Sequence, residues 1–359
     1  MTAKRIGILT SGGDCAGLNA VIRAVVHHAH GLGWEVIGIL NGPAGLLKDP
    51  PACRVLHPND FTGTVMRQGG TILGTTNKGN PFAFPMADGS TKDLSNEIIK
   101  GFRNLGIEAL IGIGGDGSFA ILKRLADQGG LKLVGIPKTI DNDLGMTEAA
   151  VGFDTAVSVA TEALDRLQPT AASHDRVMVL EVMGRDAGHI ALTAGIAGGA
   201  DVILIPEVAY KLENIARHIA AVKKSGRNFA LVVVSEAVKT PDGGKLEVTY
   251  SGGQTRYGGI GQYFAEKIAE LTGSETRVTV LGHVQRGCPP TYNDRLLASA
   301  LGVRAVDLIQ EGKFNRMVAW QNRCVVDVPL EDAIKAYQQV DLEGTLVHTA
   351  RALGISLGD

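Results

Sequence analysis

Leu131-Lys132-Leu133-Val134-Gly135-Ile136 runs directly into Pro137-Lys138-Thr139-Ile140-Asp141-Asn142-Asp143, and this change of character is the strongest fold signal in the chain. Asp and Asn are depleted in strands and favoured in turns, so the apolar run predicts a buried strand and the polar cluster predicts the loop that leaves it. Ligands of parallel α/β sheets bind beside the loops at the carboxyl ends of strands. The stretch therefore predicts an α/β fold with a functional loop at residues 139–143.

Two carboxylates, Asp141 and Asp143, stand two residues apart in this loop. One can accept a proton from a substrate hydroxyl while the other holds a metal ion or orients its neighbour. The alternative is an Asx-rich turn that caps the next helix, which is the commoner meaning of an isolated Asp-Asn-Asp. The surrounding sequence has to decide between the two.

Two further loops follow apolar runs in the same way. Residues 11–17 (SGGDCAG) follow a strand predicted at 5–10, and residues 114–118 (GGDGS) follow a strand predicted at 109–113. A helix is predicted after each loop, and free N–H groups at a helix N-terminus favour phosphate. Asp116 is placed to hold Mg²⁺ beside phosphates. A single glycine loop is as often a tight turn, but three loops that follow parallel strands share one edge of a sheet.

A second alternating series follows, with strands predicted at 177–182, 202–205, 229–235 and 277–281 and helices between them. A chain of 359 residues exceeds the roughly 250–300 residues at which single cores stop growing. We expect two lobes with a cleft. No low-complexity linker divides them, so the chain is expected to cross between the lobes more than once.

The composition limits the function classes. The 35 basic and 37 acidic residues nearly balance, so no overall field attracts nucleic acid or an anionic membrane. The four cysteines form no C-x-x-C pair, which is typical of free thiols in a reducing compartment. No apolar run approaches the ~18 residues of a membrane span. We expect a cytoplasmic protein without nucleic-acid or membrane partners.

No G-x-x-x-x-G-K-[ST] loop and no protein-kinase motif set is present. Basic side chains fall mostly near strand ends or in glycine loops, where arginine suits the capture of a phosphate. They are Arg176, Arg185, Arg277, His283 and Arg286. Each alone is more often part of a surface ion pair, whereas their shared position favours a second anion pocket.

Five of these motifs together resemble the signature set of the bacterial-type phosphofructokinase family, in the family's order between residues 5 and 319. They are residues 11–14 (SGGD), 114–118 (GGDGS), 139–143 (TIDND), 183–185 (MGR) and 282–287 (GHVQRG). The resemblance implies two Rossmann-like three-layer lobes with mostly parallel sheets and an active-site cleft between them. It implies a phosphoryl-donor lobe of residues 1–150 plus 285–333 and a sugar-phosphate lobe of residues 151–284 plus 334–359.

The resemblance also implies residue roles. Asp141 matches the catalytic base, Thr139 a substrate-positioning hydroxyl, Asp143 the companion carboxylate, and Arg185 the residue that steadies the transferring phosphoryl group. Asp116 matches the Mg²⁺ residue. Donor-phosphate positions are Gly12, Asn77, Lys78, Asp116, Gly117 and Ser118. Sugar-phosphate contacts are Thr139, Asp141, Met183, Gly184, Arg185, Glu236, His283 and Arg286, with Arg176 and Arg277 supplied by a neighbouring subunit of a homodimer or homotetramer.

Departures from the family pattern concern the donor. Lys138 is typical of pyrophosphate users, whereas Gly117 stands where those enzymes carry Asp. Ile121 replaces a small residue near the adenine. Asn77-Lys78 occupies the place of a phosphate-bridging Arg. Glycine at position 117 leaves room for an α-phosphate, so we expect Gly117 to outweigh Lys138. The expected activity is transfer of the γ-phosphoryl group of ATP to the 1-hydroxyl of fructose 6-phosphate. The alternatives are a pyrophosphate or ADP donor and, in another class, a non-catalytic sugar-phosphate or nucleotide sensor.

Overall fold

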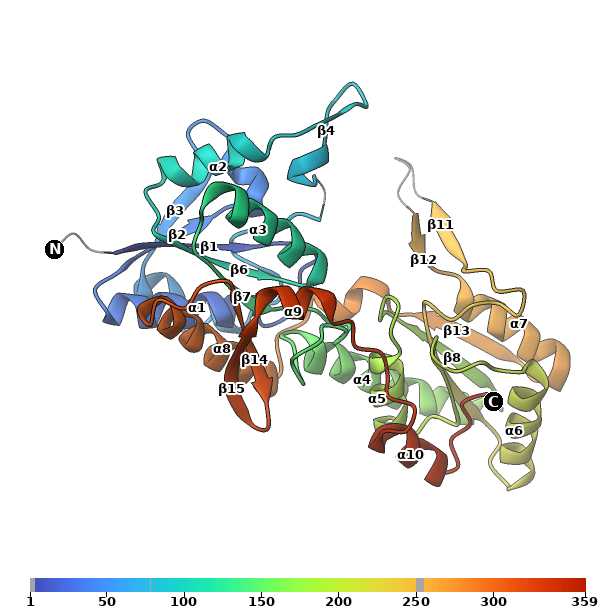
Figure 1. The fold of residues 1–359 in the computed structure, drawn as a ribbon. Helices are drawn as coiled ribbons and strands as arrows, with labels where there is room; N and C mark the ends of the chain where they lie inside the picture. The colour runs from blue at the N-terminus through green and yellow to red at the C-terminus, as the bar shows by residue number, and fades with distance from the viewer. Residues whose placement is uncertain (1–3, 78, 250–254) are drawn as a thin grey trace. The chain divides into compact units, whose positions relative to one another are not determined.

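The computed structural model describes residues 4–77, 79–249 and 255–359 (Figure 1). The chain forms two compact units, and each consists of segments that are separate in the sequence. Unit 1 comprises Met1–Ile140, Leu144–Thr155 and Arg286–Tyr337. Unit 2 comprises Asp141–Asp143, Ala156–Gln285 and Gln338–Asp359.

A seven-stranded sheet of order β15-β14-β7-β6-β1-β2-β3 forms the centre of unit 1. The five inner strands are parallel, and the two edge strands pair antiparallel. The strands are β1 (Arg5–Thr10), β2 (Glu35–Ile39), β3 (Cys53–Leu56), β6 (Ala109–Gly114), β7 (Leu133–Pro137), β14 (Arg316–Gln321) and β15 (Cys324–Pro329). Because β1, β6 and β7 are parallel neighbours, the loops that follow them lie at one edge, as the sequence predicted.

Helices cover this sheet and bury apolar side chains against it. They are α1 (Leu18–Gly31), α2 (Ser95–Asn104), α3 (Asp116–Gly129), α8 (Tyr292–Gln310) and α9 (Leu330–Lys335). Helices α1 and α8 pack closely at Gly302, where a Cβ would lie 2.8 Å from the Cβ of Ala24. Between β2 and α2, the chain is mainly short 3-10 turns, η1 (Gly42–Leu47), η2 (Pro58–Phe61), η3 (Val65–Arg67) and η4 (Pro81–Ala83), with the small hairpin β4 (Phe84–Pro85) and β5 (Thr91–Lys92).

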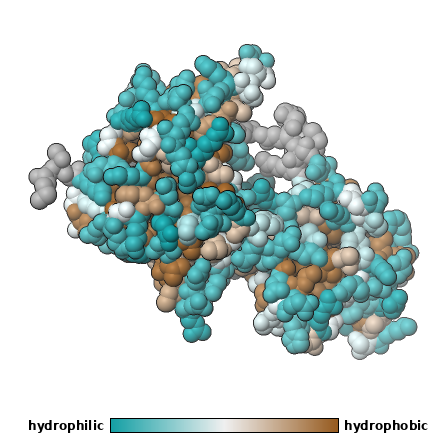
Figure 2. Space-filling view, in the orientation of Figure 1, coloured by the Kyte–Doolittle hydropathy of each residue, from teal (hydrophilic) through white to brown (hydrophobic). Residues whose placement is uncertain are grey.

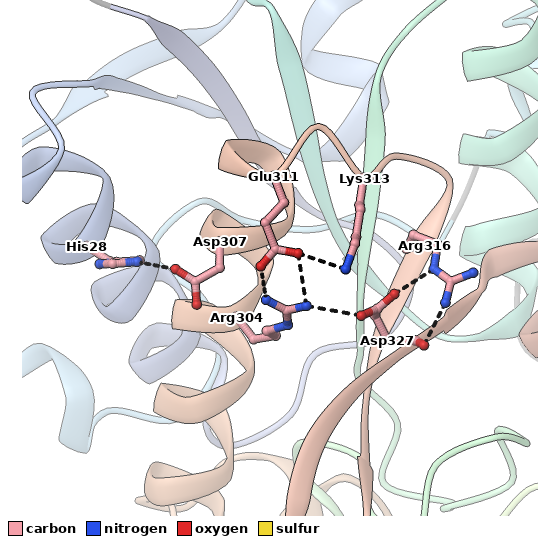
Figure 3. Close-up of polar contacts among 7 residues, drawn as sticks. All are labelled: His28, Arg304, Asp307, Glu311, Lys313, Arg316 and Asp327. Atoms are coloured by element: carbon pink, nitrogen blue, oxygen red, sulfur yellow. Dashed lines mark hydrogen bonds and ion pairs between the residues drawn. The ribbon is translucent and has the colours of Figure 1, made fainter.

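An ion-pair network joins α8 to its neighbours in unit 1 (Figure 3). His28 of α1 binds Asp307 of α8 at 2.6 Å. Arg304 of α8 pairs with Glu311. Arg304 also pairs with Asp327 of β15, at 3.1 Å. Arg316 of β14 also binds Asp327, at 2.8 Å. Single exposed pairs stabilise little, but shared partners make this network a connection between α8 and the β14–β15 hairpin.

Unit 2 contains a four-stranded parallel sheet of order β13-β8-β10-β9. Its strands are β8 (Val177–Val182), β9 (Val202–Leu204), β10 (Ala230–Ser235) and β13 (Thr276–Val280). Its helices are α4 (Phe153–Ser173), which begins in unit 1, α5 (His189–Ala197), α6 (Leu212–Lys224), α7 (Ile260–Thr272) and α10 (Thr345–Ala352). A separate hairpin pairs β11 (Glu247–Thr249) with β12 (Thr255–Tyr257).

The two mostly parallel sheets with flanking helices confirm the predicted α/β class. On the face shown in Figure 2, hydrophilic residues cover most of each unit, and hydrophobic residues reach the surface in smaller patches. Within the described ranges, no helix is long and apolar enough to cross a membrane.

Candidate active site

The loops after β1, β6 and β7 meet around Gly12 in unit 1. The N–H of Ser11 donates to the carbonyl of Ile113 at 2.9 Å. Gly12 has φ +84°, and a Cβ there would lie 3.0 Å from Ser118 Oγ and 3.4 Å from Lys138 Nζ. Only glycine combines this backbone conformation with so close an approach. Residues of all three loops within unit 1 therefore form one surface around Gly12, with the side chains of Ser118 and Lys138 beside its backbone.

Residues 75–77 extend this surface. The N–H of Gly12 donates to the carbonyl of Thr76 at 3.0 Å, and Thr75 Oγ1 donates to the carbonyl of Gly12 at 2.7 Å. These bonds place the exposed Asn77 next to the Gly12 loop. Lys78, the other predicted donor residue of this stretch, lies outside the described residues.

The first turn of α3 carries Asp116, Gly117 and Ser118. Gly117 is exposed, and a Cβ added to it would meet nothing within 4 Å. Free N–H groups and the helix dipole at this end favour a phosphate. In the described part of the chain, no group of three or more His, Cys, Asp or Glu side chains could hold a metal ion. A Mg²⁺ ion held by Asp116 and shared with substrate phosphates fits this arrangement, because Mg²⁺ commonly takes only one or two protein carboxylates.

Two cationic side chains lie along the Gly13 backbone. Lys138 is 6% exposed, and its ammonium donates to the carbonyl of Gly13 at 2.6 Å. Arg286 contacts Gly13 from another segment, since its Nη1 would be 2.5 Å from a Cβ at that position. Lys138 is thus a bonded, buried part of the loop surface.

In unit 2, three consecutive N–H groups after β8 donate to side chains from the segments that follow the neighbouring strands β13 and β10. The N–H of Met183 donates to Gln285 Oε1 at 2.8 Å. The N–H groups of Gly184 and Arg185 both donate to Glu236 Oε1, at 3.3 Å and 3.1 Å. Glu236 directly follows β10, so the carboxyl ends of β8 and β10 meet at the loop that carries Arg185.

Electrostatics connects Asp141 to this loop. Burial raises the pKa of Glu236 to about 7, and the negative charge of Asp141 contributes to the increase while the N–H of Arg185 opposes it. Asp141 is half-buried, as is Thr139, and the neighbouring Asp143 is 5% exposed. The carboxylate predicted to be the base therefore lies close enough to Glu236 for their charges to interact.

Glu236→Gln should change how stability depends on pH. The raised pKa means that native Glu236 retains a proton that the unfolded chain loses near its ordinary value of 4.5. Its stabilising contribution is complete below pH 4.5 and is lost as pH rises through about 7. We expect wild type to lose about 3 kcal/mol more unfolding free energy than Glu236→Gln between pH 5 and 8. Urea unfolding at both pH values tests this; parallel losses would contradict it.

Arg176 and Arg277 lie at the other end of the same sheet. Arg176 immediately precedes β8, Arg277 is the second residue of β13, and both guanidinium groups pair with Glu275. Met183 and the exposed His283 follow the carboxyl ends of those strands. Strands of five or six residues span roughly 20 Å. The structure does not bring these two arginines together with Arg185 within one chain.

The sequence analysis did not identify Gln285 as a site residue. It is fully buried and lies in the 282–287 motif between the predicted site residues His283 and Arg286. Its Nε2 has no hydrogen-bond partner among the described residues. The sequence analysis also missed Lys245 and Tyr257, which bind Asp186 from a segment that carries no motif. No sequence pattern indicates these contacts, because each joins residues that are distant along the chain.

Comparison with known proteins covers nearly the whole chain. The chain is 64% identical over 357 residues to the ATP-dependent 6-phosphofructokinase 1 of Synechocystis sp., with 99% of each sequence covered. It is 63% identical over 357 residues to the enzyme of the same name from Nostoc sp., again with 99% coverage of both.

Among solved structures, a phosphofructokinase from Pichia pastoris in the T-state superposes with a TM-score of 0.81 at 28% identity. The match covers 99% of this chain but 37% of that longer chain. Residues 5–309 match the family described as phosphofructokinase, and the chain belongs to that family.

Proposed function

We propose that this protein is an ATP-dependent 6-phosphofructokinase, which transfers the γ-phosphoryl group of ATP to the 1-hydroxyl of fructose 6-phosphate and yields fructose 1,6-bisphosphate. The main support for this proposal is the 64% identity over 357 residues to the Synechocystis enzyme of that name. A coupled assay of fructose 1,6-bisphosphate formation tests it. Absence of turnover with fructose 6-phosphate and Mg-ATP would reject it, and absence of turnover with Mg-pyrophosphate and Mg-ADP as well would favour a non-catalytic sensor.

The donor residues belong to unit 1. Gly12, Gly117 and Ser118 would cradle the ATP phosphates through backbone N–H groups and the α3 dipole. Asn77 and Lys78 extend the same surface in the proposal. Asp116 would hold Mg²⁺, which supplies charge neutralisation for the phosphates when bound. Lys138, fixed by its bond to Gly13, adds a positive charge beside them.

The acceptor residues act on the sugar. Asp141 would accept the proton of the 1-hydroxyl, Thr139 would orient that hydroxyl, and Asp143 would support the base. Arg185 would neutralise charge on the transferring group, which is the main demand of phosphoryl transfer. The backbone of Met183 and Gly184, with Glu236, His283 and Arg286, would bind the rest of fructose 6-phosphate. The proposed location is the cytoplasm.

A homodimer or homotetramer with shared active sites accounts for the position of Arg176 and Arg277. They lie at the amino ends of the neighbouring parallel strands β8 and β13, whereas the Arg185 loop follows the carboxyl end of β8, so neither reaches its own chain's loop. β13 is also an edge strand, with Val280 57% exposed and Val284 66% exposed just beyond it. Exposed apolar residues of this kind are expected at a subunit contact. We infer that each pair of arginines completes the site of a neighbouring copy.

Mixing two inactive variants should restore activity. Arg277→Ala subunits keep Asp141, and Asp141→Ser subunits keep Arg277, so a hybrid dimer contains one complete site. Random reassociation of equal amounts should give about a quarter of wild-type activity, since about half of the dimers are hybrids with one of two sites intact. The assay follows denaturation and joint refolding, with hybrids verified by differently tagged chains. Inactive hybrids would contradict shared sites.

A further inference from the structure

The loop that carries Arg185 is held in a conformation that side-chain residues disfavour. Arg185 has φ 51°, in the left-handed region, and it follows Gly184 with φ 153°. Such a conformation persists only where the surroundings fix it. Glu236 fixes the amide of Arg185 from one side, through the 3.1 Å hydrogen bond. A second anchor acts on the next residue.

Asp186 is bound by two side chains from the segment between β10 and α7. Lys245 Nζ and Tyr257 Oη each donate to Asp186 Oδ1 at 2.7 Å, and Lys245 Nζ also binds Tyr257 Oη. The ammonium lies 4.7 Å from the centroid of the Tyr257 ring. We call Asp186, Lys245 and Tyr257 the clasp.

The clasp remains bonded around neutral pH. Although burial raises it, the pKa of Asp186 is held below its ordinary value by hydrogen bonds from Lys245 and Tyr257. The hydrogen bond to Asp186 raises the pKa of Lys245. Burial raises the pKa of Tyr257 as well. Asp186 is therefore an anion and Lys245 a cation over the range in which a cytoplasmic enzyme works.

The clasp contributes little to the stability of the fold. The side chains of Lys245 and Asp186 are 35% and 44% exposed, and exposed pairs contribute little to folding. The three groups have a larger effect on conformation than on stability. Two donors on one carboxylate oxygen restrict the side chain of Asp186 and thus the peptide that joins it to Arg185. Both donors come from a segment that has no other role in the proposed reaction.

We propose that the clasp positions Arg185 for phosphoryl transfer, which makes Asp186, Lys245 and Tyr257 positioning residues. The inference rests on the proposed function, in which Arg185 neutralises the transferring group. Small misplacements of a charge-stabilising group are costly because the transition state needs it at a fixed distance. Loss of the clasp therefore lowers kcat more than it changes substrate binding.

The test uses the full-length enzyme with Lys245→Met and Tyr257→Phe combined. We expect kcat to fall roughly tenfold, while KM for fructose 6-phosphate stays within about twofold and the melting temperature within a few degrees. Lys267→Met is the matched control, because it removes another partly exposed lysine–carboxylate pair of unit 2, Lys267 with Glu270. The control should retain wild-type kcat.

A double-mutant cycle separates positioning from a general structural effect. On an Arg185→Ala background, removal of the clasp should have no further effect on kcat. Wild-type kcat in the clasp variant, or the same tenfold loss on top of Arg185→Ala, would overturn the inference while the proposed function stands. Full activity of Arg185→Ala would instead reject the role of Arg185 and the clasp with it.

Discussion

Replacing Asp141 with serine should lower kcat by at least the ~10²-fold that is typical of losing a general base. The serine hydroxyl cannot accept the proton of the 1-hydroxyl at neutral pH. Binding of fructose 6-phosphate should be largely retained, because the Met183–Arg185 backbone keeps its bonds to Gln285 and Glu236. Steady-state kinetics gives kcat, and calorimetric titration of the sugar phosphate gives its Kd.

The structure offers a second readout for this variant. The charge of Asp141 contributes to the raised pKa of Glu236, so Asp141→Ser should lower that pKa, which isotope-edited spectroscopy of the carboxyl group reports. Glu213→Gln, an exposed carboxylate on α6 of the same unit, is the control and should leave both readouts unchanged. Near-normal turnover of Asp141→Ser would remove Asp141 from the base role.

Introducing Asp at Gly117 should weaken the use of ATP by at least ~10²-fold in kcat/KM. Two unit charges about 4 Å apart repel by about 4 kcal/mol at an effective dielectric constant of 20, so a carboxylate beside the donor phosphates is costly. The protein itself should tolerate the change. A Cβ at Gly117 meets nothing within 4 Å, and an acidic residue in the first turn of α3 suits the helix dipole.

Gly117→Asn is the matched control, since it adds the same volume without the charge and should retain most ATP use.

Lys138→Met removes the donor to Gly13. We expect this variant to lose less ATP use than Gly117→Asp. We also expect a lower melting temperature, because a buried hydrogen bond disappears. Kinetics with saturating Mg-ATP and Mg-pyrophosphate test the donor. Unchanged ATP kinetics of Gly117→Asp, or faster turnover of wild type with pyrophosphate, would contradict the prediction.

Strongly patterned elements could be predicted from the sequence alone. The strands predicted at 5–10 and 177–182 are β1 and β8 with the same bounds, because continuous apolar runs between glycine or Asp-rich loops leave few other structures. The convergence of three loops at one edge also followed, since parallel neighbours must place their carboxyl ends together.

Elements that depend on long-range pairing escaped prediction. The edge strands β3 and β15 carry exposed and charged residues, and their alternation is too weak to separate them from loops. The bond from Lys138 to Gly13 joins residues that are far apart in the sequence. Arg176 and Arg277 lie at the amino ends of their strands, at the opposite end of the sheet from Arg185. The sequence pattern of each strand taken alone does not show how far these arginines lie from Arg185.

The order of strands in unit 1 has a consequence for how the chain is made. β7 pairs with β14, yet all of the unit 2 sheet is translated between them. The nascent chain therefore carries the unpaired edge of β7 for roughly ten to forty seconds at 5–20 residues per second. During that interval the parallel strands β8, β9 and β10 emerge as competing partners. We expect ribosome-bound chains that end before Arg316 to engage chaperones more strongly than chains that include β14.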